Sequence, residues 1–384
     1  MRSILQHIHK IVDSYEGEMP LNLFLKNYFR KHPILGSRDR KMLSEMAFAW
    51  YRCSKALNGK ISFEKKLEIC LFICETQVHQ VLQFLKPEWQ GKHDYFLPQK
   101  LGLLEKEKIK WTLAHIFPFA IELSQGILLE DWLLSMLKQP DLFIRYRKDT
   151  QRLTQLLNEH TLPYRQLTEN CFALPNATKL QDILPEKDYA VQDASSQKTG
   201  NYFKPKPGET WWDCCSGAGG KSLLLKDIQP KVKLTVSDKR ESIIQNLKKR
   251  YALYFKTLPE SIIADMTDAS QLRKQLQSKQ FDHIICDAPC SGSGTWARTP
   301  EQLYFFDDKK LDEFSALQRT IAQNALVYLK PGGTLIYITC SVFKKENETV
   351  IQSLTNVDIE HHELINGMDH KADSMFVAVL RKQA

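Results

Sequence analysis

The chain has 384 residues and a formal net charge of +8, from 53 Lys and Arg against 45 Asp and Glu. Its length exceeds one typical domain, and a hydrophobic fraction of 43% excludes an intrinsically disordered protein. Without a run of membrane-spanning length or a signal peptide's apolar core, we expect a soluble, cytoplasmic protein. Nine cysteines without CxxC pairs favour reduced thiols and no metal site. The mild basic excess suits a polyanionic partner such as RNA.

Residues 1–138 are predicted to form a helical domain, because their apolar residues recur every three to four positions. Ile4, Ile8 and Ile11 form one such stripe, and the stretch Ser37-Arg38-Asp39-Arg40 is expected to cap a later helix. We interpret the four tryptophans of this region as packing residues: Trp50, Trp89, Trp111 and Trp132.

Residues 139–188 have a different pattern, with strand-like stretches at 142–147 and 171–175 around a helical stretch at 149–159. They are predicted to form a small α/β subdomain. Its cluster of Arg145, Arg147 and Lys148 would suit a phosphate backbone, and a solvated surface is an equally open interpretation.

From about residue 205, strands and helices alternate, which predicts a parallel sheet with helices on both faces. A strand at 210–213 runs into a glycine-rich turn and a helix start, a pattern that presents backbone donors to a ligand. Asp238 ends the next strand about 20 residues beyond Gly217, where a carboxylate can bind a ribose diol. Asp265 ends the third strand.

The turn lacks the GxxxxGKS spacing of a phosphate-binding loop, and no second mononucleotide-binding half follows it. S-adenosylmethionine fits these features better than a nucleotide, since it offers a ribose, an adenine and a zwitterionic tail but no phosphate.

Two cysteines follow two further predicted strands. The strand at 281–286 ends in Asp287-Ala288-Pro289-Cys290, and the strand at 334–339 ends in Cys340. A single DxPC stretch is interpreted more simply as a buried cysteine beside a turn. Two thiols at the same edge of one sheet are difficult to explain by packing alone.

These motifs resemble a known family. The stretches DCCSGAGGKS, DAPCSGSGTWARTPE and GGTLIYITCSVFKKENE are similar to those of RNA cytosine-5 methyltransferases of the RsmB/Nop2/Sun type. The resemblance implies a Rossmann-like, S-adenosylmethionine-dependent methyltransferase domain over residues 189–384. Residues 1–138 more loosely resemble the NusB-like RNA-binding domain of bacterial RsmB-type members, and residues 139–188 would then be a small RNA-binding subdomain.

The resemblance also implies residue roles. Cys340 would add to C6 of the cytosine, Asp287 would hold or protonate N3, and Cys290 would assist the final elimination. A sulfonium and Lys221 would lower the pKa of both thiols. The cofactor would be held by Cys215, Ser216, Gly217, Ala218, Gly219, Gly220, Lys221, Asp238, Lys239, Arg240, Asp265 and Asp287.

The chain departs from the family where Ser216-Gly217-Ala218 replaces a usual Ala-Ala-Pro and where FIRYRKD replaces a usual Arg-Val-Asn pattern. The resemblance favours methylation of 16S small-subunit ribosomal RNA by a monomer that needs no metal. Two alternatives stay open: a transfer-RNA methyltransferase, and a non-catalytic RNA-binding ribosome-assembly factor. An amino-group methyltransferase is disfavoured, because such enzymes have an Asn/Asp-Pro-Pro-aromatic sequence at the position of Asp287–Cys290.

Overall fold

The computed structural model describes residues 1–74 and 79–384, and the chain divides into two compact units. We call residues 1–120, 128–139 and 295–307 the helical unit, and residues 121–127, 140–294 and 308–384 the sheet unit. Residues 295–307 belong to the helical unit, although the sequence analysis placed them in the catalytic domain. The three-domain division with boundaries at 138 and 188 stays a prediction.

The helical unit is built from amphipathic helices, as its apolar spacing predicts. In the first helix the buried side chains are Ile4, Ile8 and Ile11, which follow one another at helical spacing. Trp50, Trp89 and Trp132 are buried, which agrees with their interpretation as packing residues. The α-helices are α1 (Arg2–Ser14), α2 (Leu21–Lys31), α3 (Ser37–Cys53), α4 (Phe63–Cys74), α5 (Gln80–Leu85), α6 (Leu97–Lys106), α7 (Leu129–Met136) and α13 (Pro300–Tyr304).

Two helix starts in this unit depend on carboxylates. Within the predicted cap at residues 37–40, Asp39 accepts from the N–H of Gly36, the N-cap of α3, at 3.1 Å, whereas Ser37 is the first residue of the helix. The N–H of Leu21, at the start of α2, donates to Glu301 Oε1 at 3.1 Å, because the preceding Pro20 has no side-chain acceptor. Glu301 lies in α13, so this contact ties residues 295–307 to the N-terminal helices.

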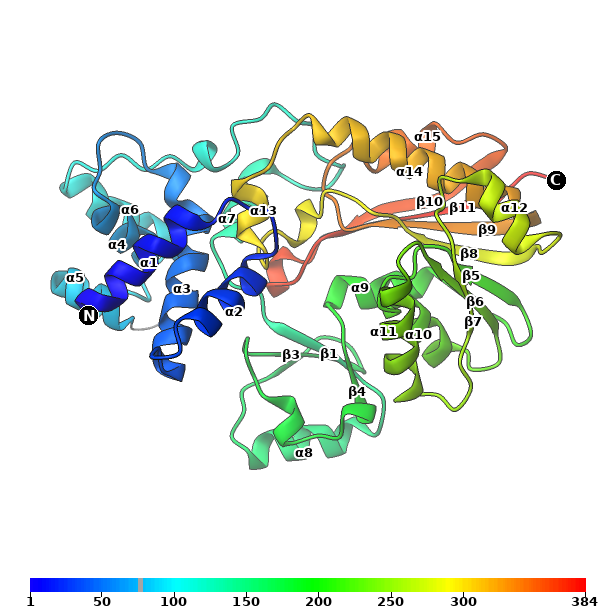
Figure 1. Ribbon diagram of the computed structural model, residues 1–384, viewed down its shortest axis with the longest axis horizontal. Coiled ribbons are helices and arrows are strands. Elements are labelled where there is room, and N and C mark those ends of the chain that lie inside the picture. The colour runs from blue at the N-terminus through cyan, green and yellow to red at the C-terminus, as the bar shows by residue number, and fades with distance from the viewer. Residues whose placement is uncertain (75–78) are drawn as a thin grey trace. The chain divides into compact units, whose positions relative to one another are not determined.

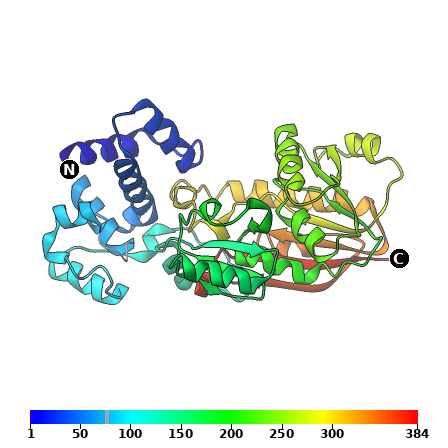
Figure 2. The same ribbon diagram turned by 90° about the horizontal axis from the view of Figure 1, so that it is seen from below.

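The sheet unit begins with a small antiparallel sheet of order β2-β3-β1-β4. Helix α8 (Thr150–Glu159) covers one of its faces (Figure 2). Leu153 and Leu157 of this helix pack with Ile144 and Phe172 of the sheet. The strands are β1 (Leu142–Tyr146), β2 (Arg165–Gln166), β3 (Cys171–Leu174) and β4 (Tyr189–Val191).

A seven-stranded sheet of order β10-β11-β9-β8-β5-β6-β7 forms the centre of this unit (Figure 1). Its five strands from β9 to β7 are parallel, as predicted, whereas β11 pairs antiparallel with β9, and β10 pairs antiparallel with β11. Strand β10 was not predicted. The strands are β5 (Thr210–Asp213), β6 (Lys233–Asp238), β7 (Glu260–Ile263), β8 (Phe281–Asp287), β9 (Leu329–Thr339), β10 (Val357–Ile365) and β11 (Met375–Lys382).

Both faces of this sheet are buried, because alternate residues along each strand enter opposite cores. Trp212 and Ile284 face one core, whereas their neighbours Trp211 and Ile285 face the other. The first core is closed by α12 (Ala269–Leu276), α14 (Lys310–Val327) and α15 (Glu348–Gln352), and the second by α10 (Gly220–Ile228) and α11 (Glu241–Ala252). The predicted Rossmann-like α/β fold is therefore confirmed.

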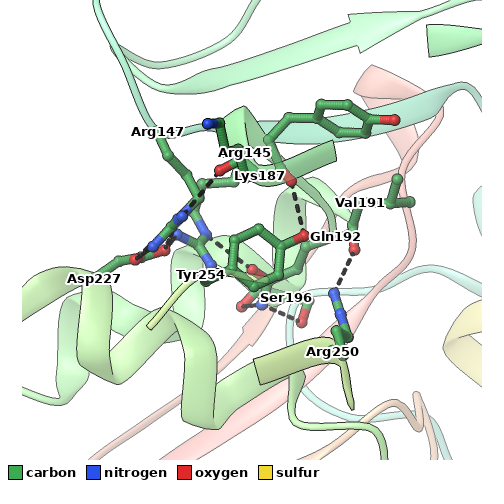
Figure 3. Close-up of polar contacts among 10 residues, drawn as sticks. Arg145, Arg147, Lys187, Val191, Gln192, Ser196, Asp227, Arg250 and Tyr254 are labelled. Atoms are coloured by element: carbon green, nitrogen blue, oxygen red, sulfur yellow. Dashed lines mark hydrogen bonds and ion pairs between the residues drawn. The ribbon is translucent and has the colours of Figure 1, made fainter. Parts of the chain in front are cut away.

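Arg145 and Arg147 of the small subdomain have an internal partner. Arg145 is only 7% exposed, and both Arg145 and Arg147 form ion pairs with Asp227 of α10 (Figure 3). The guanidinium of Arg147 also stacks over the ring of Tyr254 at 4.5 Å. The interpretations of these two arginines as a phosphate-contacting or solvated cluster are therefore wrong, while Lys148 is exposed. RNA contact by this subdomain stays a prediction.

We expect Asp227→Ala to lower the free energy of unfolding of the protein by about 3 kcal/mol, because it leaves the buried Arg145 charge without its carboxylate. Urea denaturation measures this change. Glu122→Ala removes a carboxylate that is paired with Lys344 at the surface, and it should leave the unfolding midpoint unchanged. Equal midpoints for Asp227→Ala and the wild type would contradict the prediction.

Candidate active site

The predicted site residues lie at the carboxyl ends of the parallel strands. β5 lies between β6 and β8, and the strand order reverses direction there, which is where open α/β sheets bind ligands. The loop after β5 carries residues 214–219, and Asp238 ends β6. Asp287 ends β8, and Cys340 directly follows β9. Asp265 lies two residues beyond the end of β7.

The two predicted catalytic thiols are in contact. Cys290 Sγ and Cys340 Sγ are 3.3 Å apart, and both residues are partly exposed. The hydrogen bond to Cys340, together with burial, raises the pKa of Cys290 well above its ordinary value. The second thiol therefore opposes the lowering of the Cys290 pKa that is expected from a bound sulfonium and Lys221, and that expectation stays a prediction. This thiol remains protonated near neutral pH and can donate to the sulfur of Cys340.

Lys221 pairs with the carboxylate of the site. Its Nζ is 3.1 Å from Asp287 Oδ2 and 2.9 Å from Ser196 Oγ. The Lys221 side chain is 6% exposed, whereas that of Asp287 is 33% exposed. The hydrogen-bond partners of Lys221 are thus Asp287 and Ser196, and Ser196 was not among the predicted site residues.

A buried glutamate links the loops that carry the two thiols. Glu346 is fully buried, and Oε1 accepts from Ser291 N at 2.8 Å and from Gln318 Nε2 at 2.9 Å. Its Oε2 accepts from the hydroxyl groups of Ser291 and Ser341. Ser291 follows Cys290 and Ser341 follows Cys340, so one carboxylate holds both loops. Glu346 was not among the predicted site residues, although two glutamates in the VFKKENE stretch that follows Cys340 were a usable signal.

Gly294 brings the same two loops into close contact. Its N–H donates to the Cys340 carbonyl at 2.8 Å, and its carbonyl accepts from Ser374 N at 2.9 Å. A Cβ at this position would lie 2.0 Å from the Ser374 carbonyl oxygen. Only glycine therefore fits, and the Cys290 loop is fixed against Cys340.

The glycine-rich loop is open on its outer side. Gly217 and Gly219 have positive φ values of 50° and 82°, and a Cβ on Gly217 or Gly220 would meet no atom within 4 Å. Ser216 donates from N and Oγ to the Ser237 carbonyl, and the Ala218 carbonyl accepts from Arg250 at 3.2 Å. These contacts hold the loop while leaving room beside its backbone.

The carboxylates beside this loop have partners of their own. Asp238 accepts from the Arg240 backbone and guanidinium, while Lys239 is exposed. Hydrogen bonds from the Thr267 backbone and hydroxyl lower the pKa of Asp265. Cys215 packs partly buried against the sheet core and shares sulfur hydrogen bonds with Cys214 and Cys286, so it borders the loop from the inner side.

Within residues 1–74 and 79–384, no three His, Cys, Asp or Glu side chains are grouped so that they could hold a metal ion. Nor does this part of the chain contain a helix long and apolar enough to cross a membrane.

Residues 201–381 match the family model of the 16S rRNA methyltransferases RsmB/F. Ribosomal RNA small subunit methyltransferase B of Shewanella oneidensis is 30% identical over 230 residues, which are 55% of this chain and 51% of that protein. The protein of the same name from Vibrio vulnificus is 32% identical over 210 residues, 51% of this chain and 47% of its own length. The match thus spans about half the length of these curated relatives.

Solved structures share the fold. The crystal structure of PH0851 superposes with a TM-score of 0.68 at 20% identity, covering 94% of this chain and 95% of that one. NSun6 from Pyrococcus horikoshii, solved with SFG, gives a TM-score of 0.57 at 14% identity, covering 66% of this chain and 94% of its own.

Proposed function

We propose that this chain, whose residues 201–381 belong to the RsmB/Nop2/Sun-type methyltransferase family, methylates C5 of a cytosine in 16S small-subunit ribosomal RNA. S-adenosylmethionine would be the methyl donor. The observation that carries the proposal is the contact between Cys290 and Cys340, 3.3 Å apart, at the ends of adjacent parallel strands that also present Asp287. The names of the curated relatives support ribosomal RNA as the substrate.

Two thiols suit this reaction because C5 of cytosine is a poor nucleophile. Addition of the Cys340 thiolate to C6 makes C5 enamine-like and moves electron density toward N3. Asp287 would hold or protonate N3 and so stabilise the adduct. Lys221 would keep the Asp287 side chain in place, since its ammonium lies 3.1 Å from Oδ2.

Release of the product needs a second group. After methylation the C5 proton must leave, and the bond between Cys340 and C6 must break by β-elimination. Once Cys340 is bonded to carbon, it no longer offers Cys290 a thiolate acceptor. The hydrogen bond that raises the pKa of Cys290 is then weakened, and Cys290 becomes able to assist the elimination.

The residues at the neighbouring strand ends fit S-adenosylmethionine. The open backbone at Gly217 and Gly220 admits a ligand, and the two carboxylates Asp238 and Asp265 suit a ribose diol and an adenine amino group. When bound, this cofactor supplies an electrophilic methyl group. Lys239 and Arg240 directly follow Asp238 and are exposed, so they would border this site.

We expect Asp238→Ala to weaken binding of S-adenosylmethionine on the order of tenfold, equivalent to about 1.4 kcal/mol, because it removes an acceptor for the ribose hydroxyls. Isothermal titration calorimetry measures the affinity. Glu241→Ala removes an exposed carboxylate three residues later and should bind as the wild type does. An unchanged affinity for Asp238→Ala would remove this residue from the cofactor site.

The proposed function is tested by incubating the purified chain with S-adenosylmethionine and transcribed 16S ribosomal RNA, followed by bisulfite sequencing. We expect one methylated cytosine that is absent with Cys340→Ala. Parallel reactions contain transfer RNA, and methylation there alone would overturn the ribosomal substrate. RNA binding without methylation of either RNA would instead indicate a non-catalytic assembly factor and overturn the enzymatic proposal.

A further inference from the structure

We propose that Gln192 and Ser196 are positioning residues that hold Lys221 against Asp287, and that the buried Arg145 of the small sheet fixes Gln192 in turn. This inference rests on the proposed function, because it assigns Asp287 to the reacting base. Its basis is a continuous series of hydrogen bonds from the small sheet to the end of β8.

The series begins at a buried cation. Arg145 lies on β1, and burial lowers its pKa to about 10, so that it still carries a charge near pH 7. Asp227 balances this charge by an ion pair with Nη1 of Arg145. The same carboxylate accepts hydrogen bonds from the guanidinium of Arg147. Two guanidinium groups therefore share one carboxylate, which fixes the orientation of Arg145 (Figure 3).

Arg145 determines how the amide of Gln192 is oriented. Its Nε donates to Gln192 Oε1 at 3.1 Å, and a guanidinium can only donate hydrogen bonds. The carbonyl of the Gln192 amide must therefore face Arg145. Its NH₂ group then points the other way and donates to Ser196 Oγ at 3.2 Å (Figure 3).

Ser196 is the residue through which this series reaches the active site. Its Oγ accepts from Gln192 Nε2 and also from Lys221 Nζ at 2.9 Å. The helix that carries it, α9 (Ala194–Lys198), is fixed at its start by Asp193, which accepts from Ser195 N at 2.8 Å. The hydroxyl group is thus held in place from both the helix and the small sheet.

The second partner decides where the Lys221 ammonium lies. With Asp287 as its sole anchor, Lys221 could follow the carboxylate through several rotamers, because the Asp287 side chain is 33% exposed. A fixed hydroxyl at 2.9 Å from Nζ restricts the lysine and, through it, the carboxylate that would face N3. Small displacements of such a group lower the rate of a reaction strongly.

The first test compares the kinetics of matched variants. Gln192→Leu and Ser196→Ala should each lower kcat on the order of tenfold, with a KM for RNA within about twofold of the wild type. Ser196→Thr retains a hydroxyl group and should restore kcat. Gln197→Leu is the control, because this amide on the same helix donates to the Gln192 backbone carbonyl and lies outside the series. Equal kcat values for Gln192→Leu, Ser196→Ala and Gln197→Leu would overturn the proposal.

The second test does not depend on methylation. Acetic anhydride labels free lysine amines, and mass spectrometry gives the labelling rate of Lys221 in each folded variant. We expect several-fold faster labelling in Gln192→Leu and Ser196→Ala than in the wild type and Gln197→Leu. Unchanged labelling would overturn the positioning role even in an active enzyme. A wild type that does not methylate RNA, yet shows the labelling difference, would refute the proposed function and leave the series of contacts intact.

Discussion

Cys340→Ala is expected to abolish both methyl transfer and covalent attachment to RNA, whereas Cys290→Ala should accumulate a protein–RNA adduct that carries the methyl group. The difference follows from the order of bond formation. Cys340 forms the bond to C6, so its loss removes the first step. Cys290 is required only for the elimination, so without it the reaction stops after methyl transfer.

A denaturing gel with labelled RNA distinguishes the variants. A retarded band with Cys290→Ala and none with Cys340→Ala is the expected pattern, and tandem mass spectrometry of the band should find the methyl group. Cys74→Ala, which changes a thiol in the helical unit, should resemble the wild type. An adduct with Cys340→Ala and none with Cys290→Ala would contradict this prediction and show that Cys290 is the nucleophile.

The contact between the thiols explains why a single substitution affects each step differently. With the two sulfur atoms 3.3 Å apart, a protonated Cys290 can donate a hydrogen bond to the sulfur of Cys340 during the attack on C6. Cys290→Ala removes this donor, so we expect slower attack at C6 as well as a blocked elimination. The adduct should therefore form more slowly than a wild-type turnover, and a time course of the gel measures this rate.

The position of the site could be predicted from local sequence. Apolar runs that end in glycine, aspartate or cysteine identify parallel strands, and the carboxyl ends of such strands meet at one edge of the sheet. This rule places Gly217, Asp238, Asp287 and Cys340 along a common edge, and the structure does so. The family resemblance and the matched family model then agree on residues 201–381.

Pairings between distant segments could not be predicted in this way. The sequence around Arg145 and Arg147 is basic, but Asp227 lies about 80 residues later, and only the folded chain brings it between them. Likewise, nothing in residues 295–307 indicates that their Glu301 caps a helix near the N-terminus. The charge cluster therefore suggested an RNA contact or a solvated surface, whereas Arg145 and Arg147 form an internal ion pair with Asp227.

The pKa of Cys290 was missed for a related reason. A thiol near a cationic cofactor is expected to have a lowered pKa. The hydrogen bond to a second thiol has the opposite effect, and its presence depends on two loops that close against each other at Gly294. The residue types alone therefore did not indicate that a second thiol opposes a lowered pKa at Cys290.

Glu346→Gln is expected to have the second largest effect on activity, because Glu346 accepts from both thiol loops. The amide keeps the size of the side chain but replaces one acceptor oxygen by a donor that faces other donors. We expect a loss of about 2 kcal/mol in the free energy of unfolding. We also expect a fall in kcat on the order of a hundredfold, because the loops of Cys290 and Cys340 would no longer be fixed relative to each other.

Glu348→Gln separates the two effects. Glu348 is also buried and accepts two hydrogen bonds, from Ser124 Oγ at 2.9 Å and Gln125 N at 3.1 Å, but these partners lie outside the thiol loops. Urea denaturation should show both variants destabilised, whereas kcat per folded molecule should fall only in Glu346→Gln. If both variants kept the wild-type kcat, Glu346 would stabilise the fold without positioning Cys290 and Cys340. The hydrogen bonds of Ser291 and Ser341 to Glu346 would then contribute to stability and not to catalysis.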